Sequence, residues 1–344
     1  MFRVAIIGAG PSGLFVAEET MKRFPGAAVF IYEKRDKPFG LIRYGVAPDH
    51  VTTKRVLKTF ENIAAQPGLH MMTGVEVGVA VSLNELSTKY DAVVICTGAE
   101  IPRLPDIPGA ALPGVVSGLD FARWVNGEEE ALDARLLDGI TSAVIIGNGN
   151  VALDAARMLA RQDADWDATS IAPFARDALQ RAHLHQITIV GRRSAGEASF
   201  TEAELREVVS LPGWQIQADQ GLPLGVDVPA GSSGKVIAFE FGKSPSRVTG
   251  RTRVESVEFG RGSKMIPADL AIFATGQKGC PLPGLPFDEK RGVIPNDRGR
   301  VAGSKSVYVC GWIKRGAKGL IGHNRKDAIE TVASMAEDFT PPSP

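Results

Sequence analysis

The chain has 344 residues, a length typical of two domains. With 44% hydrophobic and 23% charged residues, it has the composition of a folded globular protein, which excludes a largely disordered chain. The 39 basic and 39 acidic residues cancel, so we expect neither nucleic acid nor a membrane as a partner, and no apolar run approaches the roughly 18 residues of a membrane span. The three cysteines, Cys96, Cys280 and Cys310, form no C-x-x-C motif, which indicates neither a disulfide framework nor a redox dithiol and favours a cytoplasmic location.

The first predicted element is a strand over residues 4–9, which runs directly into a glycine turn and a helical pattern. The turn has the spacing G-x-G-x-x-G from Gly8 to Gly13. Such a turn lets the backbone approach a pyrophosphate and points the free N–H groups of the helix at it. Glu33 closes the next predicted strand, where its carboxylate can accept hydrogen bonds from ribose hydroxyls. This pattern predicts a dinucleotide site; the alternative is a tight strand-to-helix turn without a ligand.

A second copy of this pattern lies over residues 144–152, with alanine in place of the third glycine. After a stretch over 161–184, predicted as an extended helix or an inserted loop, the next strand ends in Arg192 and Arg193 instead of an acidic residue. A carboxylate there would repel the 2′-phosphate of NADP, whereas guanidinium groups bind it through charge-assisted hydrogen bonds. The sequence therefore favours NADP at the second turn; the alternative is that both arginines only solubilise a strand end.

Two further segments, 90–99 and 268–276, are near copies of each other. Each has an acidic residue, a buried-strand run and a Thr-Gly turn, and each is expected where the chain crosses between domains. We therefore predict an α/β fold with two Rossmann-like dinucleotide-binding domains, the second inserted in the first. The predicted boundaries are 1–100 for the first part of the first domain, 101–275 for the second domain, and 276–344 for the return to the first.

These motifs together resemble the two-dinucleotide-binding-domain flavoproteins related to glutathione reductase, and within them the adrenodoxin reductase-like ferredoxin–NADP reductases. The segments that carry the resemblance are 39–50, 147–154, 191–193, 311–316 and 319–322. The resemblance covers nearly the whole chain in the same order. The chain is shorter after its terminal helix than many relatives, which bears on the partner-binding surface more than on the cofactor sites.

The resemblance implies FAD on the first domain and NADP(H) on the second, and it implies no metal. The implied FAD-binding residues are Gly8, Gly10, Pro11, Ser12, Gly13, Glu33, Leu41, Val77, Trp312, Gly319, Leu320 and Ile321. The implied NADP-binding residues are Asn148, Gly149, Asn150, Val151, Arg192, Arg193, Glu204 and Gly319. His50 and Glu207 are the candidate catalytic residues near the contact of flavin and nicotinamide; the alternative is a surface histidine and a solvated helix face.

The expected reaction is hydride transfer between NADPH and the flavin, with electrons leaving the flavin itself because no dithiol pattern is present. The resemblance favours ferredoxin, an iron–sulfur protein, as the partner, and acidic ferredoxins favour basic docking segments such as 243–253 and 314–326. Three alternatives stay open at this point: an NADPH-dependent reductase of quinones, flavins or other small acceptors, an electron-input module of a larger complex, and a nucleotide-responsive binding protein.

Overall fold

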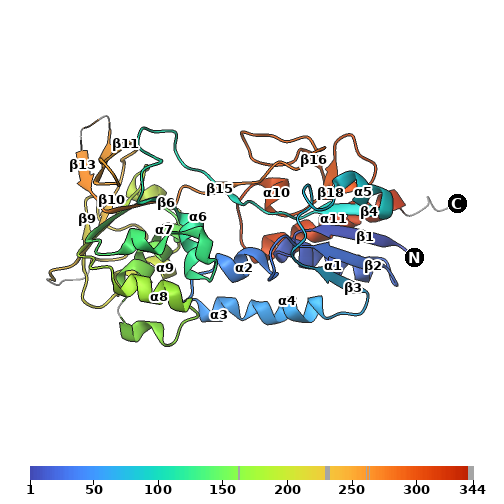
Figure 1. Ribbon diagram of the computed structural model, residues 1–344, viewed down its shortest axis with the longest axis horizontal. Helices are drawn as coiled ribbons and strands as arrows, with labels where there is room; N and C mark the ends of the chain where they lie inside the picture. Colours follow the sequence, from blue (N-terminus) through green and yellow to red (C-terminus); the bar gives the residue numbers. More distant parts are fainter. Residues whose placement is uncertain (162, 229–232, 261, 263, 340–344) are drawn as a thin grey trace. The chain divides into compact units, whose positions relative to one another are not determined.

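The computed structural model describes residues 1–161, 163–228, 233–260, 262 and 264–339 (Figure 1). The chain divides into two compact units. Unit 1 comprises Met1–Arg43, Thr52–Ile101 and Gln277–Pro344, and unit 2 comprises Tyr44–Val51 and Pro102–Gly276. The crossings after residues 101 and 276 lie one residue from the predicted boundaries. The short segment 44–51, which we placed in the first domain, groups instead with unit 2.

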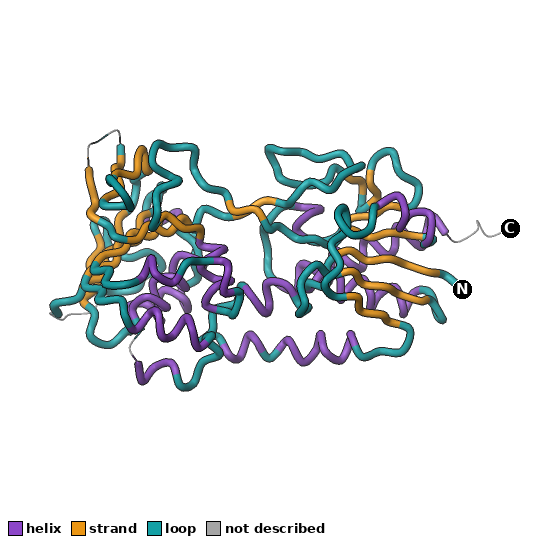
Figure 2. Tube along the Cα trace, in the orientation of Figure 1, coloured by secondary structure: helices purple, strands orange, loops and turns teal. Residues whose placement is uncertain are grey.

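Unit 1 is built on a seven-stranded sheet in which the central strands are parallel and the strands at one edge are antiparallel (Figure 2). In sheet order the strands are β16 (Asn296–Asp297), β17 (Arg300–Val301), β18 (Val307–Val309), β4 (Ala92–Ile95), β1 (Arg3–Ile7), β2 (Ala28–Tyr32) and β3 (Leu69–Met72). The helices of this part of the chain are α1 (Pro11–Arg23), α2 (Gly40–Tyr44), α3 (Val51–Lys54), α4 (Val56–Ala64), α5 (Leu83–Lys89), α10 (Trp312–Arg315) and α11 (Ile321–Phe339). The first strand ends at Ile7, earlier than predicted, because the glycine turn begins there.

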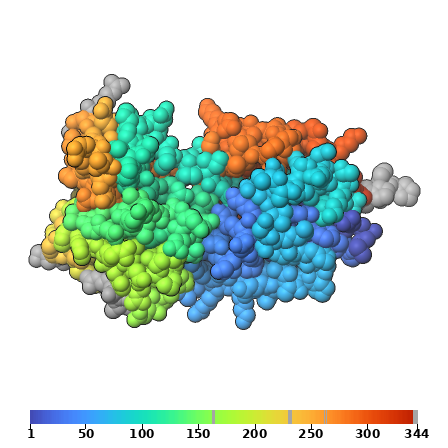
Figure 3. All heavy atoms as spheres, viewed as in Figure 1, coloured from blue at the N-terminus to red at the C-terminus, as the bar shows by residue number. Residues whose placement is uncertain are grey.

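Unit 2 contains a six-stranded parallel sheet and a three-stranded antiparallel sheet that reaches the molecular surface (Figure 3). The parallel strands, in sheet order, are β6 (Val115–Ser117), β14 (Leu270–Phe273), β7 (Ser142–Ile146), β8 (Gln186–Val190), β10 (Val236–Glu240) and β9 (Gln215–Ala218). The antiparallel strands are β11 (Pro245–Thr249), β12 (Ser256–Phe259) and β13 (Lys264–Pro267). Two short strands, β5 (Ile101–Pro102) and β15 (Gln277–Lys278), pair where the chain passes between the units.

The helices of unit 2 include two short pieces within the stretch 161–184. The helices are α6 (Gly118–Val125), α7 (Asn150–Ala160), α8 (Pro173–Gln180) and α9 (Glu202–Val209), with short 3-10 turns η1 (Glu129–Ala131), η2 (Ala134–Leu137), η3 (Asp163–Trp166) and η4 (Ala195–Glu197). The stretch is therefore not one extended helix. Pro173 occupies the first turn of α8. The N–H groups of a first turn have no partner within the helix, so the missing N–H of proline costs nothing there, and Pro173 favours the start of a new helix.

The near-copy segments perform the same task in the two units. β4 lies parallel to β1 in unit 1, and β14 lies parallel to β7 in unit 2. The acidic residue before each copy holds the start of the neighbouring strand: Asp91 accepts from the N–H of Arg3, and Asp269 accepts from the N–H groups of Thr141 and Ser142. Both units thus follow the predicted strand–turn–helix plan, and the α/β prediction with two Rossmann-like units is confirmed.

Apolar side chains of the sheets and covering helices form the cores of both units. The exposed fractions of Trp124, Trp166 and Trp214 are 0%, 2% and 8%, so all three are packing residues. Among the described residues, no helix combines the length and the apolar composition needed to cross a membrane.

Candidate functional site

In each unit, the first glycine of the glycine turn packs against the near-copy segment, which is 90–99 in unit 1 and 268–276 in unit 2. A Cβ on Gly8, which has φ +105°, would lie 2.6 Å from the carbonyl oxygen of Cys96. A Cβ on Gly147 would lie 2.5 Å from the carbonyl oxygen of Ala274. Both distances are far below a normal contact, so each turn requires glycine for packing alone. These two glycines are therefore not by themselves evidence of a ligand.

Gly10 differs, because no contact with a described residue requires glycine there. Its φ is −77°, which any residue adopts, and a Cβ built there has no atom within 4 Å. The space over Gly10 is open at the N-terminus of α1. A glycine in that place is explained by close approach of a ligand backbone such as a pyrophosphate.

The helices that follow the two glycine turns have no side-chain caps. Gly10 precedes α1 and Gly149 precedes α7, and neither helix receives a capping hydrogen bond from a side chain. By contrast, α5, α6 and α9 are capped by Ser82, Ser117 and Thr201. The first N–H groups of α1 and α7 are thus available to an anion, and the helix dipoles favour a negative charge there.

Glu33 lies beside the turn of unit 1, as the ribose role requires. Its side chain is 6% exposed, and its carboxylate accepts from the N–H groups of Ala9 at 2.9 Å and Arg35 at 3.0 Å. These bonds hold the carboxylate in one orientation, and a carboxylate has further lone pairs that can accept from hydroxyl groups. The residues of unit 1 therefore fit the adenosine end of FAD.

Four further implied FAD residues lie at four places in unit 1. Leu41 belongs to α2, and Val77 is buried in the core cluster of the sheet. Trp312 starts α10, and its indole N–H is buried without a hydrogen-bond partner among the described residues. Leu320, just before α11, is 78% exposed. An unsatisfied indole N–H and an exposed apolar side chain suit a large planar ring with polar edges.

In unit 2, the turn before α7 holds unsatisfied polar atoms. The amide oxygen and nitrogen of Asn148 are both buried, and neither has a hydrogen-bond partner among the described residues. Its backbone carbonyl accepts from the N–H and the hydroxyl of Ser199, and the side chain of Asn150 accepts from the N–H of Thr201. A buried amide without partners costs free energy unless a ligand satisfies it. Val151, the next implied contact, is 48% exposed.

Arg192 and Arg193 follow β8 after the single buried residue Gly191, and both are exposed. Neither forms an ion pair with another described residue. Two unpaired guanidinium groups at the carboxyl end of a parallel strand fit an anion such as the 2′-phosphate of NADP. Gly319, the remaining implied NADP contact, belongs to unit 1, so its approach to the same nucleotide stays a prediction.

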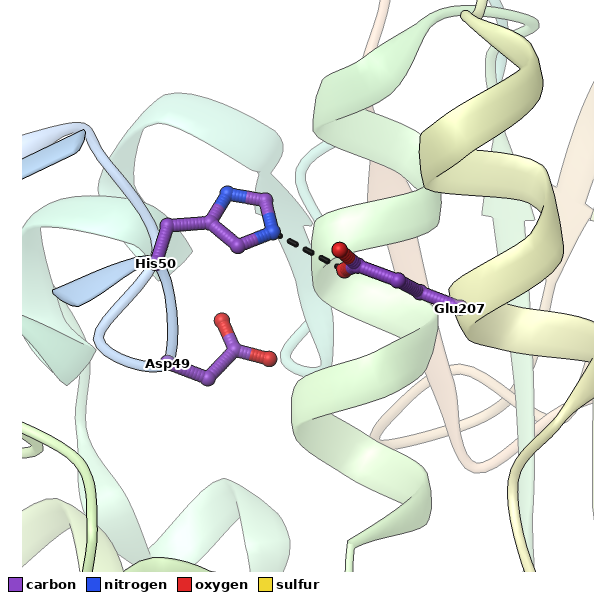
Figure 4. A group of neighbouring side chains, drawn as sticks. All are labelled: Asp49, His50 and Glu207. Atoms are coloured by element: carbon purple, nitrogen blue, oxygen red, sulfur yellow. Dashed lines mark hydrogen bonds and ion pairs between the residues drawn. The ribbon is translucent and has the colours of Figure 1, made fainter. Parts of the chain in front are cut away.

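The candidate catalytic pair is in contact. His50 Nε2 and Glu207 Oε2 lie 2.9 Å apart, although the residues are 157 positions apart in sequence (Figure 4). His50 lies in the segment 44–51 and Glu207 on α9, and both belong to unit 2. The side chain of His50 is 18% exposed and that of Glu207 is 47% exposed, so the histidine is partly buried and the glutamate is open to solvent.

A buried arginine, which the sequence analysis did not single out, organises this pair. The side chain of Arg157 on α7 is 1% exposed. Its guanidinium contacts Asp49 (Nε–Oδ2, 2.5 Å), Asp154 (Nη2–Oδ1, 2.6 Å), Glu204 (Nη1–Oε2, 3.2 Å) and Glu207 (Nη1–Oε2, 3.3 Å). We call Asp49, His50, Asp154, Arg157, Arg161, Glu204 and Glu207 the Arg157 cluster. The i, i+3 spacing of Asp154 and Arg157 was its only visible sequence signal.

The cluster shifts the pKa values of its members. Burial lowers the pKa of His50, but the hydrogen bond to Glu207 and the charges of Glu204 and Asp154 outweigh burial and the repulsion of Arg157, so the pKa lies above its ordinary value. Burial raises the pKa of Asp154 to about 6, although Arg157 opposes this. Burial raises the pKa of Asp49, but the hydrogen bonds and charges of Arg157 and Arg161 outweigh burial, so the pKa lies below its ordinary value.

The carboxylates of the cluster share the positive charge of Arg157. Ligand atoms of Asp49, His50 and Glu207 lie within 4.8 Å of one another, a spacing compatible with an ion. However, the guanidinium of Arg157 already bonds to these carboxylates and supplies the positive charge. Glu204 bonds to the same arginine and so belongs to the cluster, and its contact with NADP stays a prediction.

Two of the three cysteines meet in unit 1, which the sequence did not indicate. Cys96 and Cys310 follow the neighbouring parallel strands β4 and β18, and both are buried free thiols. Burial raises the pKa of Cys96 well above its ordinary value, so the group stays a thiol. A buried protonated thiol is a poor nucleophile and does not act as the missing redox dithiol.

Most cations of the predicted docking segments are already paired. Lys243 bonds to Asp219, and the guanidinium of Arg253 donates to backbone carbonyls. In the second segment, three cationic side chains form ion pairs with acidic residues: Lys314 with Glu330, Arg315 with Asp327, and Arg325 with Glu18. Charge clustering in the sequence therefore overstates the free positive charge of these segments.

Comparison with known proteins places this architecture in a large family. The family model described as pyridine nucleotide-disulphide oxidoreductase matches residues 2–210. NADPH-ferredoxin reductase FprA of Mycobacterium tuberculosis is 37% identical over 98% of this chain and 84% of its own length. Mitochondrial NADPH:adrenodoxin oxidoreductase of Mus musculus is 35% identical over 98% of this chain and 78% of its own.

Solved structures agree with these relatives. The structure of Mycobacterium tuberculosis FprA in complex with NADPH matches with a TM-score of 0.90 and 35% identity, over 98% of this chain and 84% of that chain. Thioredoxin reductase of T. acidophilum matches with a TM-score of 0.63 at 17% identity, over 98% of both chains, and supports the fold alone.

Proposed function

Because this chain belongs to the pyridine nucleotide-disulphide oxidoreductase family, we propose that it is an FAD-dependent NADPH–ferredoxin reductase. The similarity to adrenodoxin reductase-like ferredoxin–NADP reductases expected from the sequence is confirmed by its relatives, which are named for ferredoxin and adrenodoxin. The observation that carries the proposal is the pair of uncapped glycine turns, one followed by Glu33 and the other by Arg192 and Arg193. An acidic residue after one turn and two arginines after the other fit two different dinucleotides in one chain.

The chain's residues bind and orient, while bound FAD supplies a ring that accepts a hydride and gives up electrons singly. In unit 1, the open space at Gly10 would admit the pyrophosphate, and the carboxylate of Glu33 would accept from the ribose hydroxyls. In unit 2, the N-terminus of α7 and Asn148 would hold the second pyrophosphate, and Arg192 and Arg193 would bind the 2′-phosphate. The rate of hydride transfer then depends on how well these sites fix the two rings.

The test of this proposal is anaerobic. We expect the purified protein to carry FAD, to lose its yellow colour within seconds of mixing with NADPH, and to reduce cytochrome c only when ferredoxin is added. Bleaching without ferredoxin-dependent turnover would keep both cofactor sites and move the function to quinones, other small acceptors or a larger complex. An absence of bleaching would contradict the proposal as a whole.

His50 and Glu207 are proposed to orient the contact between nicotinamide and flavin. Their hydrogen bond and the partial burial of His50 give the pair a fixed position. We expect His50→Gln and Glu207→Gln each to slow flavin reduction by NADPH about 10-fold, a typical effect of losing one positioned charge-assisted bond, with FAD content unchanged. Stopped-flow rates equal to those of the parent protein in both variants would remove the pair from the reaction.

The cytoplasmic location stays part of this proposal. It is supported by the three free cysteines, two of them buried and in contact, which a reducing compartment preserves. Fractionation of cells that produce the full-length protein tests the location directly.

A further inference from the structure

One ring nitrogen of His50 has two short contacts of opposite chemical character. His50 Nε2 lies 2.9 Å from the carboxylate oxygen Oε2 of Glu207. The same nitrogen lies 2.9 Å from the guanidinium nitrogen Nη2 of Arg157. Both are hydrogen-bond distances, and both contacts lie within unit 2.

The two hydrogen bonds exclude each other. A guanidinium only donates, and an ionised carboxylate only accepts. When Nε2 carries a proton it can donate to Glu207, and its contact with Arg157 is then repulsive. When Nε2 has lost the proton, its lone pair can accept from Arg157, and its contact with Glu207 is then unfavourable.

We propose that Arg157 is a positioning residue of this site and the alternative partner of His50. Loss of the proton from Nε2 to solvent exchanges Glu207 for Arg157 as the hydrogen-bond partner, and the return of the proton reverses the exchange. In the neutral state the remaining ring proton then sits on Nδ1. The imidazole ring stays in place in both states because each state offers it a partner.

The guanidinium is held firmly enough for this role. Arg157 donates to Asp49 through Nε and Nη2, at 2.5 and 3.2 Å, and to Asp154 through Nη2 at 2.6 Å. Asp49 is itself 3% exposed and accepts a further bond of 2.6 Å from Arg161. Nη2 has two N–H groups and three neighbouring acceptors, so a bond to neutral His50 uses the N–H group that otherwise forms the longer bond to Asp49 Oδ1. The bonds of Nε to Asp49 and of Nη2 to Asp154 keep the guanidinium in place meanwhile.

The segment that carries His50 is held at other points as well. The carbonyl of Pro48 accepts from the N–H of Ser170 at 3.0 Å. The carbonyl of Val46 accepts from the side chain of Asn126 at 3.0 Å. Because these bonds do not involve the ring, the backbone stays in position while the ring changes partner.

Charged groups from every element packed against the ring act on its proton. Asp49 lies on the same segment, Asp154 and Arg157 come from α7, and Glu204 and Glu207 come from α9. The acidic groups favour the proton on His50, and Arg157 is the opposing cation in contact with the ring. Removal of Arg157 should therefore strengthen proton binding, and removal of Asp49 should weaken it.

The direct test is a nitrogen-15 NMR titration of His50 in the flavin-loaded full chain, with its signal among the five histidines assigned by His50→Gln. We expect Arg157→Gln to raise the midpoint by about one pH unit and Asp49→Asn to lower it. The neutral ring should carry its proton on Nδ1 in the parent protein and on Nε2 in Arg157→Gln. Arg157→Lys, which retains the charge, should recover at least half of the shift.

Arg161→Gln is the matched control, because this arginine bonds to Asp49 but not to His50. Its shift should be smaller than that of Arg157→Gln. Equal midpoints in the parent, Arg157→Gln and Asp49→Asn proteins, or an unchanged tautomer in Arg157→Gln, would overturn the inference. If Arg157→Gln does not fold, Asp49→Asn and Arg157→Lys decide it through the midpoint and the tautomer.

The consequence for catalysis rests on the proposed function. The pH dependence of flavin reduction by NADPH should move in the same direction as the His50 midpoint in each variant. A parent protein that NADPH does not reduce would contradict the proposed function and leave the NMR result standing. A reducible parent whose pH profile does not move in Arg157→Gln would overturn the role of Arg157 in positioning for the reaction.

Discussion

Replacing both Arg192 and Arg193 with alanine should lower kcat/KM for NADPH about 100-fold and leave kcat/KM for NADH within about threefold. Both side chains are exposed and unpaired among the described residues, so their loss leaves no buried charge behind. A charge-assisted bond to a phosphate contributes about 1.5–3 kcal/mol, and two solvent-facing arginines together account for about 3 kcal/mol. NADH has no 2′-phosphate and should not respond.

The control for general charge effects is Arg181→Ala. Arg181 is also exposed in unit 2 but is bonded to Asp138, away from the strand end. It should change neither coenzyme's kcat/KM. Calorimetric binding of 2′,5′-ADP separates recognition from turnover, and it should weaken only in the double variant. An equal loss for NADPH and NADH would mean that the arginines stabilise unit 2 instead of reading the phosphate.

The sequence was sufficient for the parts of the fold that follow local rules. A short apolar run, a glycine turn and a helical pattern depend on residues close together in the chain, and both copies form strand, turn and helix in the structure. The near-copy segments were recognisable because β4 and β14 must pack beside the glycine turns, which restricts their residues in the same way. The end of β8 at the arginine pair was equally local.

The Arg157 cluster was not predictable by such rules. Asp49 and Arg157 are 108 residues apart, and the segment 44–51 joins unit 2 although the chain on both sides of it belongs to unit 1. A charged residue on a helix is ordinarily exposed, so the local sequence around Arg157 does not predict its burial. Only the tertiary structure brings enough carboxylates together to keep a guanidinium 1% exposed. For the same reason the docking segments looked more basic than they are, since pairing such as that of Arg325 with Glu18 spans 307 residues.

Gly10→Ala should weaken FAD binding about 100-fold and leave the melting temperature of the flavin-free protein unchanged or slightly raised. The added methyl group meets no protein atom within 4 Å, and φ at −77° suits alanine. Alanine restricts the unfolded chain more than glycine, which contributes up to about 1 kcal/mol of stability where the backbone conformation is compatible. The loss appears only when a pyrophosphate approaches the N-terminus of α1, because the methyl group displaces it from one or two N–H donors, each contributing about 1.5–3 kcal/mol.

Titration of flavin-free protein with FAD, followed by quenching of flavin fluorescence, measures the affinity, and thermal unfolding of the same samples measures the fold. Gly234→Ala is the matched control, since that glycine also has open space around its Cβ position but lies in unit 2, far along the chain from the turn. It should leave both readouts unchanged. A Gly10→Ala protein that binds FAD as tightly as the parent would show that the flavin pyrophosphate does not pass over Gly10, and would leave the openness of that turn without a ligand to explain it.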